Sequence, residues 1–199
     1  MSRAPLRRRR PVIAAVALGA VVAGAGIYWR FRTDLPARFA EVEPGRVYRG
    51  GYPDPKALGR LADRYGVRSV VSLMLDSPDE GRTLAERDAA RALGLRLIEI
   101  PMPGDGRAEF DDLDRAADAV AEAQASGPVF FHCAAGRQRS NAVTAAYRMR
   151  RCGWGYDAAM KELEAHFGLE PGDKPDLREH LRRYWTERLA ATRPATGGG

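Results

Sequence analysis

A cysteine, an arginine and a serine stand close together in residues 128–152, which read PVFFHCAAGRQRSNAVTAAYRMRRC. Cys133 precedes Arg139 by six positions, and Ser140 follows at once. A thiolate is a nucleophile, a guanidinium binds two oxygens of a tetrahedral anion, and a hydroxyl can donate a hydrogen bond to sulfur. These residue types predict nucleophilic attack on a bound phosphate group, with Ser140 assisting when the sulfur leaves.

The elements on either side must position these groups. The apolar run 129–131 predicts a buried strand, and apolar residues at helical spacing from Ala142 onward predict a helix that starts near Arg139. The loop between them contains small residues where the backbone must approach a ligand, and it ends at a helix N-terminus, which attracts anions and lowers the pKa of a thiol. The predicted phosphate-binding residues are Ala134, Ala135, Gly136, Arg137, Gln138 and Arg139. We expect His132 to support the loop through hydrogen bonds.

HCAAGRQRS resembles the HCxxGxxR(S/T) signature of the cysteine-dependent protein tyrosine and dual-specificity phosphatases. VYRGGYP, residues 47–53, resembles the segment with which that family's domain begins, and the resemblance covers about residues 40–170. It implies phosphomonoester hydrolysis through a cysteinyl-phosphate, on protein phosphotyrosine or with dual specificity. A phosphoinositide or phospholipid phosphatase and a catalytically silent phosphate-binding module remain alternatives. Asn141 departs from the pattern, since many members have glycine there.

The family also uses an aspartic acid on a neighbouring loop to protonate the leaving oxygen. Our assignment is Asp105, which lies between two glycines in PMPGDGR and precedes Cys133 by 28 residues, slightly fewer than is usual in the family. The flanking glycines would let this loop close over a substrate. Asp111 and Asp112 are alternatives, although both could instead cap a helix, and Asp76 is a third.

Charge is distributed unevenly along the chain. The net charge is +6, but residues 1–38 contain eight arginines and one aspartate, which leaves 24 Lys and Arg against 25 Asp and Glu in the rest. The folded part is therefore nearly neutral, which argues against nucleic acid as a partner. The three histidines and two cysteines show no metal-ligand spacing, so we expect no metal and no cofactor.

Residues 11–29 contain no charged side chain and follow a basic tail, residues 1–10. As a helix these 19 residues would be about 28 Å long, close to the hydrocarbon thickness of a bilayer. We therefore expect a single transmembrane anchor at 11–30, with the domain on the extracytoplasmic side because arginines are denser before the segment. The alternatives are a cleaved secretory signal, with Ala23-Gly24-Ala25 as its site and a secreted product, and a domain that faces the cytoplasm.

The rest of the chain is expected to comprise a linker at 31–44, a phosphatase domain at 45–190 and a disordered tail at 191–199. Apolar strand-like runs alternate with helical patterns, among them about 55–65 and 156–167. An amphipathic helix is expected at 79–93, with Leu84 and Leu93 facing inward. The alternation predicts an α/β domain with a mainly parallel central sheet flanked by helices, similar to the dual-specificity phosphatases.

Overall fold

The computed structural model describes residues 34–190, except for the side chains of residues 76–79. The predicted basic tail 1–10, the membrane segment 11–30 and the tail 191–199 lie outside these described residues. Among the helices that the structure describes, none has the length and apolar character needed to cross a bilayer.

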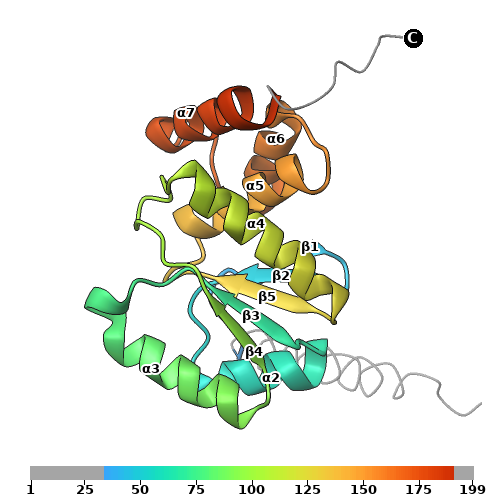
Figure 1. Cartoon of the computed structure of the whole chain (residues 1–199), viewed down its shortest axis with the longest axis vertical. Coiled ribbons are helices and arrows are strands. Elements are labelled where there is room, and N and C mark those ends of the chain that lie inside the picture. The colour runs from blue at the N-terminus through green and yellow to red at the C-terminus, as the bar shows by residue number, and fades with distance from the viewer. Residues whose placement is uncertain (1–33, 191–199) are drawn as a thin grey trace, which may run out of the picture. The chain divides into compact units, whose positions relative to one another are not determined.

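A five-stranded sheet forms the centre of the domain, with the strand order β1-β2-β5-β3-β4 (Figure 1). The strands β2, β5, β3 and β4 run parallel, and β1 pairs antiparallel with β2. Their bounds are Ala40–Glu43 for β1, Val47–Gly50 for β2, Ser69–Ser72 for β3, Arg96–Glu99 for β4 and Val129–His132 for β5. Every residue of β2, β3 and β5 is buried, as expected for parallel strands that are covered on both faces. The predicted α/β architecture with a mainly parallel sheet is confirmed.

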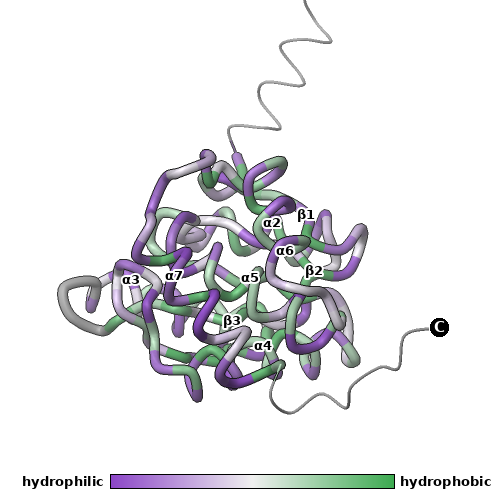
Figure 2. The backbone as a smooth tube through the Cα atoms, turned by 90° about the horizontal axis from the view of Figure 1, so that it is seen from above, coloured by the Kyte–Doolittle hydropathy of each residue, from purple (hydrophilic) through white to green (hydrophobic). Residues whose placement is uncertain are grey.

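Helices cover both faces of the sheet. In Figure 1, α2 (Pro55–Tyr65) and α3 (Asp76–Ala92) lie on one face, and the remaining helices lie on the other. These are α4 (Phe110–Ala125), α5 (Gln138–Arg150), α6 (Tyr156–His166) and α7 (Pro175–Arg183), which continues into a π-helical turn, η2 (Tyr184–Leu189). Figure 2 shows α5 near the centre of the projection, with α6 and α7 on either side of it. All residues of α5 from Arg139 to Met149 are buried.

The parallel strands bring their carboxyl ends to one edge of the sheet. His132 at the end of β5 is in register with Gly50 of β2 and with Ser72 of β3. The residues that follow these three strands are therefore neighbours in space, although they are distant in sequence. This edge is where α/β folds place their binding sites.

Three details differ from the prediction. Strand β1 lies inside the predicted linker 31–44, so the folded domain begins before residue 45. Leu84 of α3 and Leu93, the C-cap of that helix, are 50% and 41% exposed, so the expected inward face is wrong. The buried face of α3 instead contains Thr83, Glu86 and Ala90, at positions i, i+3 and i+7. The pattern of apolar residues predicts the wrong buried face because this helix buries the polar side chains of Thr83 and Glu86.

The start of α4 also differs. The N-cap is Glu109, and Asp111 and Asp112 lie within the first turn rather than at the cap. Two acidic side chains in this turn still interact favourably with the helix dipole.

Candidate active site

The loop that follows β5 begins with Cys133 and turns directly into α5. Cys133 is only 3% exposed, and the loop lies directly on the chain that follows β2. Gly136 has a φ of +65°, and a Cβ there would lie 2.6 Å from the carbonyl carbon of Gly50 and from the amide nitrogen of Gly51. Only glycine allows both this left-handed conformation and this close approach. The loop is therefore held in one shape by the backbone beneath it.

Hydrogen bonds surround the sulfur of Cys133. Ser140 Oγ lies 3.2 Å from Cys133 Sγ and equally far from the carbonyl oxygen of Gly50. Burial alone would raise the pKa of Cys133, but the Ser140 hydroxyl, the backbone N–H groups of Ser140 and Arg137, and the charge of Arg139 together lower it. These amides belong to the N-cap and the first turn of α5, and the helix dipole also favours a negative charge there. A thiolate is thus stabilised at a position that is almost closed to solvent.

Arg139 lies in the same helical turn as Ser140. Its Nη1 donates a hydrogen bond of 2.9 Å to the carbonyl oxygen of Leu73, the residue directly after β3. Its Nε is buried and has no hydrogen-bond partner within the described part of the chain. A buried donor on a cation destabilises the fold when it has no partner, and a bound anion would accept its hydrogen bond. The arrangement can therefore accept a tetrahedral oxyanion beside the sulfur.

His132, directly before the cysteine, is fully buried and pairs with Glu86 of α3. The distance between His132 Nε2 and Glu86 Oε1 is 2.5 Å, and Ser72 Oγ donates to the other carboxylate oxygen at 2.9 Å. This links β5, α3 and β3 behind the loop. We expected His132 to make supporting hydrogen bonds, but sequence reasoning missed Glu86. The only signal was its position on the same helical face as Thr83 and Ala90.

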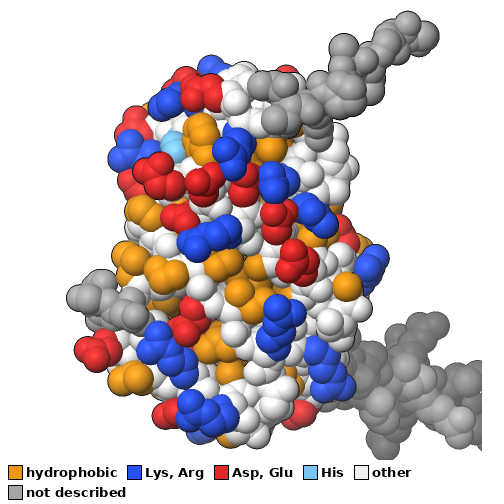
Figure 3. Space-filling model, viewed as in Figure 1, with side chains coloured by type: hydrophobic (Ala, Val, Ile, Leu, Met, Phe, Trp, Pro, Cys, Tyr) orange, Lys and Arg blue, Asp and Glu red, His pale blue; other side chains and the backbone are white. Residues whose placement is uncertain are grey.

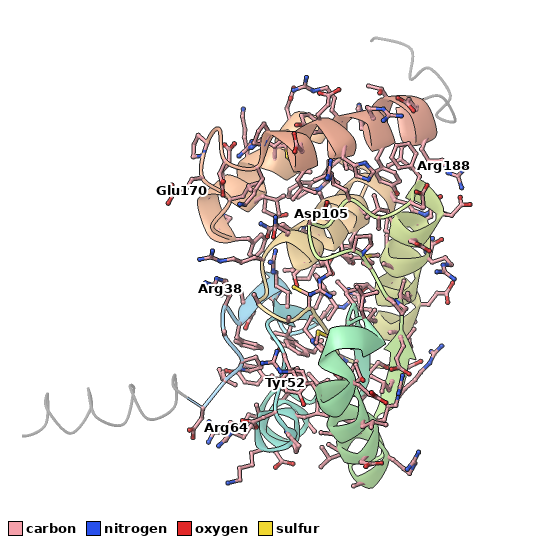
Figure 4. All side chains as sticks on the ribbon, turned by 90° about the vertical axis from the view of Figure 1, so that its left-hand side faces the viewer. Arg38, Tyr52, Arg64, Asp105, Glu170 and Arg188 are labelled. Carbon is pink, nitrogen blue, oxygen red and sulfur yellow. The ribbon has the colours of Figure 1, made fainter. Side chains whose placement is uncertain are left out.

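Asp105 lies on the loop between β4 and α4, above Tyr52 and Arg38 in Figure 4. Its carboxylate accepts hydrogen bonds from the backbone N–H of Arg107 at 3.0 Å and from Arg107 Nε at 2.8 Å. The backbone N–H of Arg107 lowers the pKa of Asp105 most, burial opposes this, and the Arg107 guanidinium lowers it further. Asp105 is thus ionised in this conformation, and a role as a proton donor requires its separation from Arg107.

Packing places the Asp105 loop against the end of the cysteine loop. Gly106 has a φ of +79°, and a Cβ there would lie 2.7 Å from the carbonyl oxygen of Gln138. Asp105 and Gln138 also line one cavity of about 330 Å³. These two observations place the Asp105 loop beside the loop that contains the nucleophile.

The alternative acids have other partners. Asp111 pairs with Arg188 at 2.6 Å, and Asp112 pairs with Arg115 at 2.5 Å. Neither lines the cavity that Asp105 shares with Gln138. The side chain of Asp76 lies outside the described part of the structure.

The other predicted loop residues differ in how far they are exposed. Arg137 is exposed, and Ala134, Ala135 and Gln138 are partly or fully exposed. Both cysteines, Cys133 and Cys152, are free thiols. Within residues 34–190, no group of His, Cys, Asp and Glu side chains is arranged to hold a metal ion.

Together, the parallel sheet and the cysteine loop at its carboxyl edge define a phosphatase fold of the dual-specificity, protein-tyrosine-phosphatase type. Residues 36–170 match the family described as PTP-NADK, "DSP-PTPase phosphatase fused to NAD+ Kinase". The chain belongs to this family of phosphatase domains.

Known proteins similar to this chain differ in what their names say they act on. The dual specificity protein phosphatase TpbA of Pseudomonas aeruginosa is 28% identical over 90% of this chain and 80% of its own length. The human phosphatidylglycerophosphatase and protein-tyrosine phosphatase 1 is 26% identical over 77% of this chain and 80% of its own. The crystal structure of PTPMT1 in complex with PI(5)P superimposes with a TM-score of 0.64 at 21% identity, covering 77% and 97% of the two chains. That last similarity concerns the fold alone.

Proposed function

We propose that this chain hydrolyses phosphomonoesters through a cysteinyl-phosphate intermediate. The observation that carries the proposal is a buried thiol of lowered pKa next to a buried arginine whose Nε has no hydrogen-bond partner among residues 34–190. Family membership supports it independently.

In the first step, the Cys133 sulfur attacks the phosphorus atom and the bond to the leaving oxygen breaks. The loop amides and Arg139 stabilise the charge on the three equatorial oxygens, and Asp105 gives its proton to the leaving oxygen. In the second step, Asp105 accepts a proton from water, the water oxygen attacks the phosphorus, and the sulfur leaves. The hydroxyl of Ser140, 3.2 Å from the sulfur, stabilises the thiolate that is released.

The substrate that we favour is a phosphorylated protein, with phosphotyrosine or dual specificity. The similarity to TpbA, over 90% of this chain, supports this choice. Figure 3 shows acidic and basic side chains interspersed on one face of the domain, rather than a single basic field that would suit nucleic acid.

A second candidate substrate is a phosphoinositide or a phospholipid phosphate. The human relative is named for activity on both a lipid and protein phosphotyrosine, and the PTPMT1 structure contains PI(5)P. We further propose that residues 11–30 anchor the chain in a membrane with the domain on the extracytoplasmic side, which would bring it close to lipid. A cleaved signal and a secreted domain form the alternative, and reporter fusions at both ends would distinguish them.

The test is a turnover assay of the full chain with p-nitrophenyl phosphate, followed by a phosphotyrosine peptide, a phosphothreonine peptide and vesicles that contain a phosphoinositide. We expect hydrolysis of the aryl phosphate and of at least the phosphotyrosine peptide. Faster release of phosphate from the vesicles would favour the lipid candidate. Binding of orthovanadate without turnover of any of these substrates would contradict the enzyme and indicate a phosphate-binding module.

A further inference from the structure

Three donors, one before β1, one within β2 and one directly after β2, hold three consecutive carbonyl oxygens of the cysteine loop. The three hydrogen bonds are Tyr52 N–H to Ala134 O at 3.1 Å, Arg38 Nη1 to Ala135 O at 2.8 Å, and Arg49 Nη2 to Gly136 O at 2.9 Å. Within one trans peptide unit, the C=O of a residue and the N–H of the next residue point in opposite directions. Holding the carbonyl oxygens outward therefore leaves the N–H groups free to face the anion.

Among these three donors, the Arg49 side chain is the deeply buried one. It is 1% exposed, although it is an arginine in the interior of the sheet on β2. Its Nη1 donates to Thr144 Oγ1 at 2.9 Å, and its guanidinium lies 4.6 Å from the centre of the Phe167 ring. The same Thr144 hydroxyl donates to the carbonyl oxygen of Ser140 at 2.7 Å. Arg49 thus joins the cysteine loop to the first turns of α5.

The charge of Arg49 has no carboxylate paired with it among the described residues. A buried cation without an anion is strongly disfavoured, so some negative charge must balance it. Burial lowers the pKa of Arg49 to about 10, while the charges of Cys133 and Glu162 oppose this change. Glu162, on α6, is already bound by two nitrogens of Arg148. The remaining anion near Arg49 is the thiolate of Cys133.

The other charged groups near the sulfur are accounted for. Arg139 approaches from α5 and hydrogen-bonds to Leu73 O, and Asp105 approaches from the loop after β4 and is paired with Arg107. His132 and Glu86 pair with each other behind the loop. None of these groups bonds to the carbonyl oxygen of Gly136, as Arg49 does.

We propose that Arg49 is a positioning residue of the phosphatase reaction, which holds the Gly136 carbonyl away from the phosphate and sets its buried charge against the Cys133 thiolate. The proposal rests on the proposed function, but both effects belong to the resting protein. They are measurable without turnover.

The test measures two quantities in the full chain with Cys152→Ser, so that one thiol reacts: the pH dependence of alkylation by iodoacetamide, and the affinity for orthovanadate. In Arg49→Met we expect alkylation to slow about tenfold when it is measured below the midpoint of the parent's pH profile, because the thiolate has lost a nearby cation. Vanadate affinity should fall about tenfold as the loop carbonyl is released. Arg49→Lys retains the charge without the two-pronged geometry, so the alkylation profile should stay near that of the parent while vanadate affinity still falls.

The matched control is Arg148→Met. Arg148 is also a buried arginine that bonds to a carbonyl oxygen and stacks on an aromatic ring at 4.6 Å, but its partners are Val42 O, Glu162, Glu43, Trp154 and the sulfur of Cys152. It should lose thermal stability and leave both measured quantities unchanged. If a folded Arg49→Met shows the parent alkylation profile and vanadate affinity, or if Arg148→Met shifts them equally, the proposal is wrong.

Thr144→Val is the variant to use if Arg49→Met does not fold. It removes one hydrogen-bond acceptor of Arg49 at nearly constant volume, and we expect a smaller change in the same direction in both quantities. Parent values in both Thr144→Val and Arg49→Lys would overturn the proposal. A chain without phosphatase turnover that still shows these shifts would contradict the proposed function and leave the role of Arg49 intact.

Discussion

Two buried arginines in this domain have similar surroundings but opposite charge balance. Arg49 lies 4.6 Å from the centre of the Phe167 ring, and Arg148 lies 4.6 Å from that of Trp154. Arg148 binds Glu162 with two nitrogens, at 2.8 and 2.6 Å, and although burial opposes it, this carboxylate raises the pKa of Arg148 above its ordinary value. Among the described residues, Arg49 hydrogen-bonds to a hydroxyl and a carbonyl oxygen and pairs with no carboxylate, and burial lowers its pKa. A carboxylate therefore neutralises Arg148, whereas Arg49 has no carboxylate partner in this part of the chain.

The same difference separates two regions of the molecule. At the cysteine loop, arginine side chains bond to carbonyl oxygens: Arg38 to Ala135, Arg49 to Gly136 and Arg139 to Leu73. Among α4, the later turns of α5, α6 and α7, arginines pair with carboxylates: Arg148 with Glu162, Arg150 with Asp118 and Arg178 with Glu164. A domain whose net charge is close to zero thereby concentrates uncompensated positive charge at one edge of its sheet. This is how a nearly neutral protein can bind a doubly charged phosphate.

The two cysteines test this comparison most strongly, because one lies in each region. The pKa of Cys133 is lowered by its surroundings, whereas burial raises the pKa of Cys152, which lies near Glu43 and Arg148. In Cys133→Ser we expect kcat to fall on the order of 10⁴-fold or more, because the nucleophile is lost. Orthovanadate binding should persist, since Arg139 and the loop amides remain.

Kinetics with p-nitrophenyl phosphate and vanadate titration measure both quantities. Cys152→Ser is the control and should retain full activity. Turnover that survives in Cys133→Ser would show that the charge at the loop serves another nucleophile.

The next effect in size concerns the acid. Asp105→Asn should lower kcat about 10²- to 10⁴-fold with aryl phosphates of poor leaving groups, because the leaving oxygen then departs without a proton. The loss should be much smaller with a good leaving group, which needs less protonation. Asp112→Asn, in the first turn of α4, is the control. An equal loss in both variants would mean that the Asp105 loop is not the acid loop.

For the region in which arginines pair with carboxylates, we expect a substitution to lower stability and to leave activity nearly unchanged. Glu162→Gln removes the carboxylate that Arg148 binds with two nitrogens and leaves it the longer ion pair with Glu43, at 3.5 Å, so we expect the free energy of unfolding to fall by about 1–3 kcal/mol. Because Arg148 lies outside the cysteine loop, kcat/KM should change less than about threefold, which corresponds to roughly 0.6 kcal/mol. Urea unfolding and steady-state kinetics check the two expectations. A large loss of kcat/KM at retained stability would remove the distinction between the regions.

The parts of the fold that sequence predicts well are those whose cause is local. The bounds of α2 follow from its Asp54 N-cap and from Gly66 in the left-handed conformation at its end. The grouping of Cys133 with Arg139 and Ser140 follows from one loop and one helical turn. Arg49 and Glu86 could not be predicted, because their burial depends on partners 87 and 46 residues away. Charged residues in a short strand and on a surface-like helix carry no local sign that the fold encloses them.

The smallest expected effect tests whether Arg107 controls the acid. The backbone N–H of Arg107 lowers the pKa of Asp105 most, and the guanidinium adds to this. Because the reaction needs Asp105 protonated, a lower pKa moves the alkaline loss of activity to lower pH. Arg107→Gln removes the guanidinium but keeps the N–H, so the pKa of Asp105 should rise in part and the alkaline limb of kcat should move to higher pH.

Stopped-flow or steady-state kcat with p-nitrophenyl phosphate across pH 5–8 measures the alkaline limb. Asp105→Asn should remove this limb altogether, which would assign it to Asp105. Arg115→Gln takes away the cation that pairs with Asp112 at 2.5 Å and is the matched control, with an unchanged profile. A limb that stays in place or moves to lower pH in Arg107→Gln would contradict this prediction, because the loss of a nearby cation raises the pKa of a carboxyl group.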